Sequence, residues 1–247
     1  QSMKFLKPVY INDEIIVPEC TWTGSVAPVT YLNAIPVFAD ISKENWCIDP
    51  DSITKNITPK TKGVISVNLY GCMPDYQKIK EICENNKLFL IEDAAESLGS
   101  TLKGKISGSF GTFSVHSFHR TKTLTTGEGG ALLTDDSELY QRCKFLRDHG
   151  RSTEVPYFTL EATPKYMPSN LMGSLACAQL DRVDELISIK RDIRDSYINE
   201  LEEVIEEIDI IKDTPYYTNG CWATTLVVKN ANFKSKDVIE FFKSKGL

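Results

Sequence analysis

The stretch Gly63 to Ala95, GVISVNLYGCMPDYQKIKEICENNKLFLIEDAA, holds two apolar runs on either side of an amphipathic segment. The first run, GVISVNLYG, is rich in β-branched residues, and the second, KLFLIEDAA, is continuously apolar until its acidic end; both predict buried strands. Between them, Asp75 precedes apolar residues at helical spacing, which predicts a capped helix. The stretch therefore predicts a strand, a helix and a second strand in sequence.

The same rhythm extends to both sides of this stretch. Further strands are expected at EIIVP, IPVFAD, TFSVH and GGALLTDD, with helices at GSVAPVTYLNA and after Asp135 or Asp136. The helix after Asp136 is expected to turn Leu139, Tyr140, Cys143 and Leu146 inward. Apolar strands joined by amphipathic helices predict an α/β fold with a mostly parallel sheet covered on both faces.

The second half of the chain has a different pattern. Apolar residues follow one helical stripe from Asn170 to about Val204, which predicts one long helix with Ser169 as its cap. CWATTLVV, residues 221–228, alternates as a strand, and KSKDVIEFFKSKG is expected to be a helix. We therefore expect a large domain over residues 1–180, then a bridging helix and the start of a smaller α+β domain over residues 181–247.

Composition limits the function classes. The net charge of −6 and the isoelectric point near 5.2 argue against nucleic acid as the main partner. No apolar run approaches the roughly 20 residues that a membrane span needs. The seven cysteines form no CxxC pair and no spacing suited to zinc, so we expect no metal site, reduced thiols and a cytoplasmic protein.

Two residues carry the functional prediction. Asp93 stands where the strand LFLIED ends, and Lys122 lies in SFHRTKTLTTGEGG between two predicted strands. Ligands of open α/β sheets bind beyond the carboxyl ends of the strands. Pyridoxal 5′-phosphate (PLP) needs an amine for its aldehyde and a carboxylate for its ring nitrogen, so this pair predicts a PLP site.

Two further residues have a functional and a structural interpretation each. Ser117 is a candidate donor to the cofactor phosphate, or a loop serine that bonds its own turn. Trp22 is a candidate to lie flat on the cofactor ring, or an aromatic residue of the core or the rim.

Three motifs in register, IEDAAESLGS, GKISGSFGTFSVHSFHRTKTLTTGEGG and LRDHGR, resemble the DegT/DnrJ/StrS family of PLP-dependent nucleotide-sugar aminotransferases. The resemblance covers essentially the whole chain and implies an aspartate-aminotransferase-like fold (fold type I). It implies that Lys122 forms the Schiff base, that Asp93 faces the ring nitrogen and that Ser117 binds the phosphate. Glu96 stands where the family has a residue near the cofactor's 3-hydroxyl, and Trp22 matches the stacking aromatic residue.

The sequence departs from the family pattern in two places. A phosphate-binding segment of the family is expected before Gln1, so the sequence is interpreted as a fragment of a longer protein. Lys165 stands where many relatives have an asparagine that reaches the phosphate in the neighbouring subunit, which implies a homodimer with shared active sites. His119 and Glu128 flank Lys122 and either move protons or are structural.

The resemblance implies transfer of an amino group from L-glutamate to a nucleotide-linked keto sugar. TKTLTTGEGG is most similar to the perosamine and viosamine branch, which aminates C4 of a 4-keto-6-deoxy sugar. A 3-keto sugar aminotransferase, a PLP-dependent sugar dehydratase and a catalytically silent PLP-binding regulator remain alternatives. The dehydratases carry histidine at the position of Lys122, which favours amino transfer. A nicotinamide-dependent enzyme is disfavoured because no GxGxxG follows the first strand.

Overall fold

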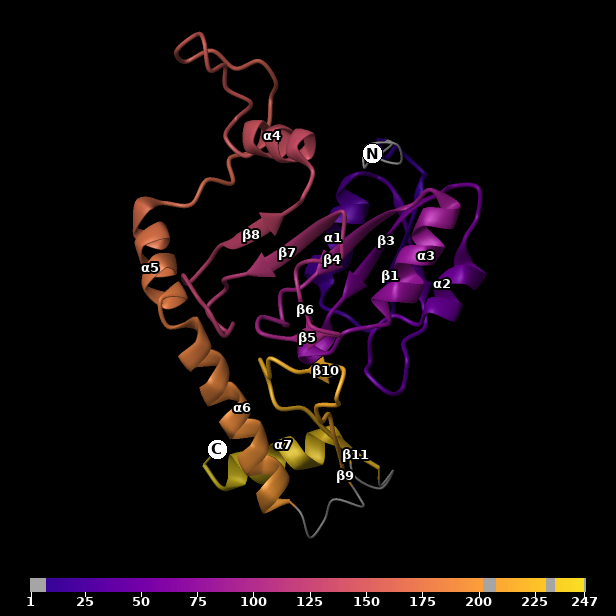
Figure 1. Ribbon diagram of the computed structural model, residues 1–247, viewed down its shortest axis with the longest axis vertical. Coiled ribbons are helices and arrows are strands. Elements are labelled where there is room, and N and C mark those ends of the chain that lie inside the picture. Colours follow the sequence, from indigo (N-terminus) through magenta and orange to yellow (C-terminus); the bar gives the residue numbers. More distant parts are fainter. Residues whose placement is uncertain (1–7, 202–207, 230–233, 247) are drawn as a thin grey trace.

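A computed structural model describes residues 8–201, 208–229 and 234–246. Its centre is a six-stranded sheet in the order β2-β1-β3-β4-β7-β8 (Figure 1). All neighbouring strands are parallel except β8, which runs antiparallel to β7. The strands are β1 (Glu14–Pro18), β2 (Ile35–Ala39), β3 (Thr61–Val67), β4 (Phe89–Asp93), β7 (Phe113–Ser117) and β8 (Gly130–Leu133). The structure confirms the predicted α/β class with a mostly parallel sheet.

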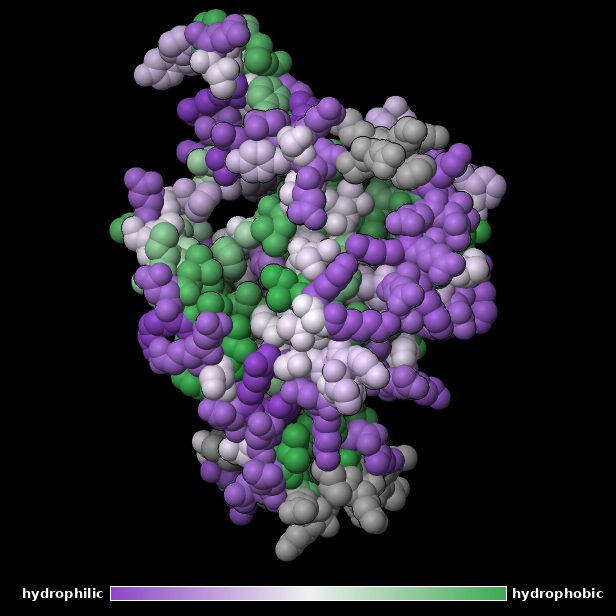
Figure 2. All heavy atoms as spheres, viewed as in Figure 1, coloured by the Kyte–Doolittle hydropathy of each residue, from purple (hydrophilic) through white to green (hydrophobic). Residues whose placement is uncertain are grey.

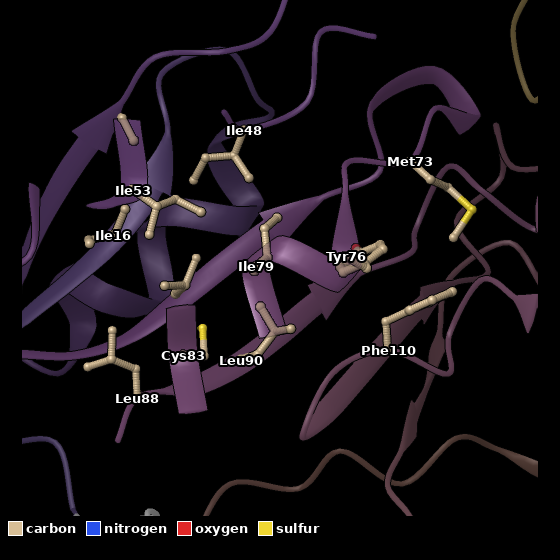
Figure 3. Close-up of a cluster of buried hydrophobic side chains, with 12 residues drawn as sticks. Ile16, Ile48, Ile53, Met73, Tyr76, Ile79, Cys83, Leu88, Leu90 and Phe110 are labelled. Atoms are coloured by element: carbon tan, nitrogen blue, oxygen red, sulfur yellow. The ribbon is translucent and has the colours of Figure 1, made fainter. Parts of the chain in front are cut away.

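Helices cover both faces of this sheet because its strands are apolar on both sides. In β1, Ile16 belongs to one buried cluster, whereas Ile15 and Val17 belong to another. The first cluster lies under α2 (Pro50–Asn56) and α3 (Tyr76–Asn86), as Figure 3 shows for Ile53 and Tyr76 among its labelled side chains. The second cluster includes Val29 of α1 (Thr23–Tyr31). As predicted, Asp75 caps α3, and its carboxylate accepts a hydrogen bond from the Lys78 N–H at 3.2 Å.

The long helix predicted from Asn170 to Val204 is wrong. The structure has two helices, α5 (Asn170–Leu180) and α6 (Val183–Glu200), with a break at Asp181 and Arg182, and Val204 lies outside the described residues. Ser169 caps α5 as predicted. The apolar periodicity continues through the break, so the pattern alone does not reveal it.

Two predictions of detail are also wrong. In α4 (Ser137–Leu146), Tyr140 is 52% exposed rather than turned inward. Of the predicted strand over residues 221–228, only β11 (Leu226–Val228) forms, and it pairs with β9 (Ile208–Ile210). The chain from Cys221 to Thr225 is irregular, and α7 (Ser235–Ser244) forms as expected.

A strand that follows α6 in the sequence joins a second, three-stranded sheet of order β10-β5-β6. β10 (Tyr217–Thr218) pairs with β5 (Thr101–Leu102), which also pairs with β6 (Lys105–Ile106). On α6, the Arg191 guanidinium donates to the carbonyls of Gly99 and Asn219, at 2.9 and 3.1 Å. The segment from Tyr217 to Asn219 is thus anchored beside the carboxyl ends of the central strands. None of the helices in the described ranges is long and apolar enough to cross a bilayer.

Candidate active site

Asp93 is the last residue of β4, at the carboxyl end of the sheet as the sequence predicts. One of its oxygens, Oδ2, accepts a hydrogen bond from the Ser25 hydroxyl of α1 at 2.7 Å. The other, Oδ1, accepts from the Ala95 N–H at 3.1 Å. Two donors from different segments therefore fix the orientation of this carboxylate, which is only half-buried.

Lys122 is not an ordinary surface lysine. Its Nζ lies 3.2 Å from Oε1 of Glu96, and the two side chains are only 14% and 12% exposed. The other carboxylate oxygen of Glu96 accepts from the Tyr70 N–H at 2.9 Å. The backbone N–H of Lys122 donates to the His119 carbonyl at 2.9 Å, which closes a turn in the loop after β7. The fold thus brings the predicted lysine and Glu96, three residues beyond Asp93, into one ion pair.

Ser117 ends β7, next to β4 in the sheet. Its hydroxyl oxygen accepts from the His119 N–H at 3.2 Å, so the hydroxyl proton remains free to donate to a ligand. Ser117, Glu96, Lys122 and Thr123 line one pocket. The Thr123 hydroxyl is buried and has no hydrogen-bond partner within the described part of the chain. A pocket with an amine, a carboxylate and hydroxyls that can still bond a ligand fits a phosphorylated aldehyde such as PLP.

The structure adds Trp222 to this pocket, a residue that the sequence analysis placed in a strand. The Lys122 ammonium lies 3.9 Å from the centroid of the Trp222 ring, a cation–π contact. The indole N–H donates to the Thr121 carbonyl at 2.7 Å. Trp222 lies 100 positions after Lys122 and in irregular chain, so no local pattern could have found it.

The two remaining predicted residues are not seen in contact with this pocket. Trp22 immediately precedes α1 and is 78% exposed, three residues before the Ser25 that bonds Asp93. Lys165 is exposed in the chain between α4 and α5, which projects from the body in Figure 1. Its backbone forms an isolated antiparallel β-bridge with Asp148. His119 and Glu128, 3.8 Å apart, form a largely exposed pair near the lysine loop.

The buried cysteines Cys47, Cys72 and Cys221 do not compete with the lysine. Burial raises the pKa of Cys47 well above its ordinary value, and raises the pKa of Cys72 to about 12 and that of Cys221 to about 11. These thiols therefore stay protonated at neutral pH and are poor nucleophiles. The described residues also contain no cluster of His, Cys, Asp and Glu side chains suited to a metal ion.

A lysine and an aspartate at the carboxyl ends of a mostly parallel sheet define the class of PLP-binding α/β proteins. Residues 3–247 match the model of the DegT/DnrJ/EryC1/StrS aminotransferase family, and the chain belongs to this family. The match confirms the resemblance that the sequence motifs predicted.

Individual relatives agree with this assignment. The chain is 36% identical over 220 residues to a GDP-perosamine synthase of Escherichia coli, covering 89% of this chain and 60% of the relative. It is 34% identical over 217 residues to a GDP-perosamine synthase of Vibrio cholerae, covering 88% of this chain and 59% of the relative. The chain therefore spans about three fifths of the length of these curated relatives.

A solved structure has the same fold. A putative sugar aminotransferase from Streptococcus pneumoniae, in its PLP form, superimposes with a TM-score of 0.88 at 30% identity. The superposition covers 96% of this chain and 66% of that one. This similarity confirms the predicted fold type of the PLP-dependent sugar aminotransferases.

Proposed function

We propose that the protein transfers the amino group of L-glutamate to a nucleotide-linked 4-keto-6-deoxy sugar, with PLP as its cofactor. The observation that carries the proposal is the Lys122–Glu96 ion pair in a pocket beside the end of β4, where Asp93 stands. The named relatives support the 4-keto-6-deoxy class, because the two proteins described above are GDP-perosamine synthases.

Each pocket residue has a separate task in this proposal. Bound there, PLP supplies an aldehyde that reversibly bonds an amine and a ring that accepts electrons. Lys122 provides the amine, and Asp93 keeps a proton on the ring nitrogen while Ser25 holds the carboxylate in place. Ser117 and Thr123 offer hydroxyl protons to the phosphate or to the substrate. Once its amine is free, Lys122 removes a proton from the α-carbon of glutamate.

Glu96 serves the lysine before the cofactor is bound. Its carboxylate holds the ammonium at 3.2 Å, and the Tyr70 N–H holds the carboxylate. The amine is therefore kept inside the pocket rather than in solvent, which lowers the entropic cost of bonding the cofactor. The position of Glu96 relative to the cofactor's 3-hydroxyl is part of the proposal.

The partner of the chain in this proposal is a second copy of itself. α5 contains no buried residues, and its Leu171, Leu175 and Leu180 are 84%, 44% and 52% exposed. Figure 2 shows apolar atoms gathered along the side of the molecule where α5 lies. An apolar surface of this kind favours coverage by another protein, which supports a homodimer.

A shared active site would explain the projecting chain between α4 and α5. Lys165 lies there, exposed and away from the pocket of its own chain, so we propose that it reaches the cofactor phosphate of the partner. Lys165→Ala should then weaken PLP retention by about 10- to 150-fold without unfolding, the loss of a charge-assisted bond of roughly 1.5–3 kcal/mol. Mixed dimers of Lys165→Ala and Lys122→Ala chains should regain one intact site. If the active protein sediments as a monomer in analytical ultracentrifugation, this model is contradicted.

The experiment that tests the reaction is product analysis. The whole protein with PLP and L-glutamate is incubated with a panel of nucleotide-linked 3-keto and 4-keto sugars, and the products are identified by mass spectrometry and NMR. We expect an amino group at C4 of a 6-deoxy sugar and an equal amount of 2-oxoglutarate. Amination at C3, loss of a ring hydroxyl, or cofactor binding without turnover would each support one of the alternatives instead.

A further inference from the structure

Trp222 belongs to a closed circuit of contacts that is made by Lys122, Trp222, Tyr70 and Glu96. The Lys122 ammonium lies over the Trp222 ring at 3.9 Å, and the ring of Tyr70 stacks on that of Trp222 with centroids 6.3 Å apart and planes 8° apart. The Tyr70 N–H donates to one oxygen of the Glu96 carboxylate, and the other oxygen forms the ion pair with Lys122. The amine is thus held between a carboxylate and an aromatic face that are themselves connected.

A second contact ties Trp222 to the backbone of the lysine loop. The indole N–H donates at 2.7 Å to the carbonyl of Thr121, the residue directly before Lys122. Trp222 therefore fixes both the backbone before the lysine and the amine at the end of its side chain.

The backbone around this circuit is strained. Tyr70 has φ 53°, Cys221 has φ 57°, and Trp46, whose ring meets that of Tyr70 edge-on at 6.0 Å, has φ 57°. Non-glycine residues adopt this left-handed region at an energetic cost and keep it only where their surroundings hold them there. Asn219 links two of these turns, because its side chain accepts from the Cys221 N–H at 2.7 Å and donates to the Tyr70 carbonyl at 3.3 Å. Such clustered strain is typical of functional sites.

We propose that Trp222 is a positioning residue, which holds the Lys122 amine ready for the cofactor aldehyde. The inference rests on the proposed function, because it requires Lys122 to be the amine that bonds PLP. An unrestrained lysine samples many rotamers, and a ring face together with a carboxylate reduces that sampling before the reaction. The segment after α6 thereby contributes to lysine reactivity as well as to packing.

The test separates bond formation from cofactor binding. The rate of bond formation between Lys122 and PLP is measured by stopped-flow absorbance and confirmed by borohydride trapping at Lys122. Affinity for pyridoxamine phosphate, which has no aldehyde to react with lysine, is measured by calorimetry. Trp222→Leu removes the ring and should slow bond formation about tenfold, because the lysine side chain then samples more rotamers before it meets the aldehyde, with pyridoxamine phosphate affinity within about twofold of wild type. Trp222→Phe keeps a ring face and should restore the rate to within about threefold of wild type.

Tyr216→Leu is the matched control, because Tyr216 lies on the same segment and is 70% exposed. This variant should react at the wild-type rate. An unchanged rate in Trp222→Leu, or an equal loss of pyridoxamine phosphate affinity, would overturn the positioning role. If Trp222→Leu does not fold, Trp222→Met gives the same comparison with a longer and more flexible side chain. A wild-type protein that forms no bond with PLP at Lys122 would instead refute the proposed function itself.

Discussion

The pocket is lined by Ala95 and Glu96, shortly after β4, and by Trp222, which ends the segment from Asn219 to Trp222. The protein holds these two regions in different ways. β4 lies between β3 and β7 and pairs with both along parallel ladders. The segment from Asn219 to Trp222 has no ladder of its own, and side-chain hydrogen bonds and Arg191 hold it. The first region is therefore fixed by strand ladders on both sides, and the second by hydrogen bonds of individual, mostly buried groups.

Glu92 shows how firmly the first region is held. Its carboxylate is fully buried and accepts four hydrogen bonds, from the Asn68 amide at 2.9 Å and from the Gly108 N–H, the Phe110 N–H and the Ser114 hydroxyl at 2.8 Å each. These donors connect β4 to β7 and to the loop before it. Strands paired on both sides open with global unfolding, whereas irregular segments outside the ladders open locally. We therefore expect the Asn219–Trp222 segment to open first.

The largest effect is expected from Lys122→Ala, which removes the reactive amine between the two regions. Amino transfer should fall by on the order of a thousandfold or more, because covalent attachment and proton transfer are both lost. The absorbance of the Schiff base should disappear while PLP still binds noncovalently, as checked by spectroscopy and dialysis. The exposed Lys105 provides the control, since Lys105→Ala should keep the wild-type spectrum. A wild-type spectrum in Lys122→Ala would place the reactive amine elsewhere.

The next largest effect should come from Asp93→Asn, which tests the β4 region alone. An amide of the same shape can accept from the Ala95 N–H and donate to the Ser25 hydroxyl oxygen, but it cannot keep the ring nitrogen protonated. Turnover should drop about a hundredfold, with an unchanged unfolding transition. Asp135→Asn, at an exposed position, should leave turnover as it is. Near-normal kcat in Asp93→Asn would mean that another carboxylate faces the ring.

Glu92→Gln should affect stability rather than chemistry. The amide replaces one of the two carboxylate oxygens with an NH2 group, which faces either the Asn68 and Gly108 donors or the Phe110 and Ser114 donors, so at least one charge-assisted bond is lost. The free energy of unfolding should fall by about 2 kcal/mol, measured from urea transitions. Glu81→Gln on the exposed side of α3 should change it by less than about 0.5 kcal/mol. An equal loss in both variants would show that Glu92 is not the anchor of this region.

The contrast between the two regions also explains what the sequence could predict. Asp93 and Ser117 were found because each ends a strand, and strands of a parallel sheet leave a recognisable apolar pattern. Lys122 was found in the loop between two predicted strands, and Glu96 through motifs shared with a family. Trp222 and Tyr70 were missed because left-handed turns and contacts across more than a hundred residues place them, and neither leaves a local periodicity. The domain boundary near residue 180 and the task of Lys165 stay predictions.

The smallest effect is expected from Asn219→Ala, which tests whether the Asn219–Trp222 segment opens separately. The side chain of Asn219 is buried, and its loss leaves the Cys221 N–H without its acceptor. The free energy of global unfolding should fall by only about 1 kcal/mol, because this segment already opens below the global transition. Local opening of the segment should increase. It is measured by acrylamide quenching of Trp222 fluorescence, in a protein in which the other two tryptophans are replaced by Trp22→Phe and Trp46→Phe. Asn219→Asp keeps the acceptor for Cys221 and should show less quenching than Asn219→Ala. If quenching stays at the wild-type level while stability falls as far as in Glu92→Gln, the segment is part of the same cooperative unit as β4.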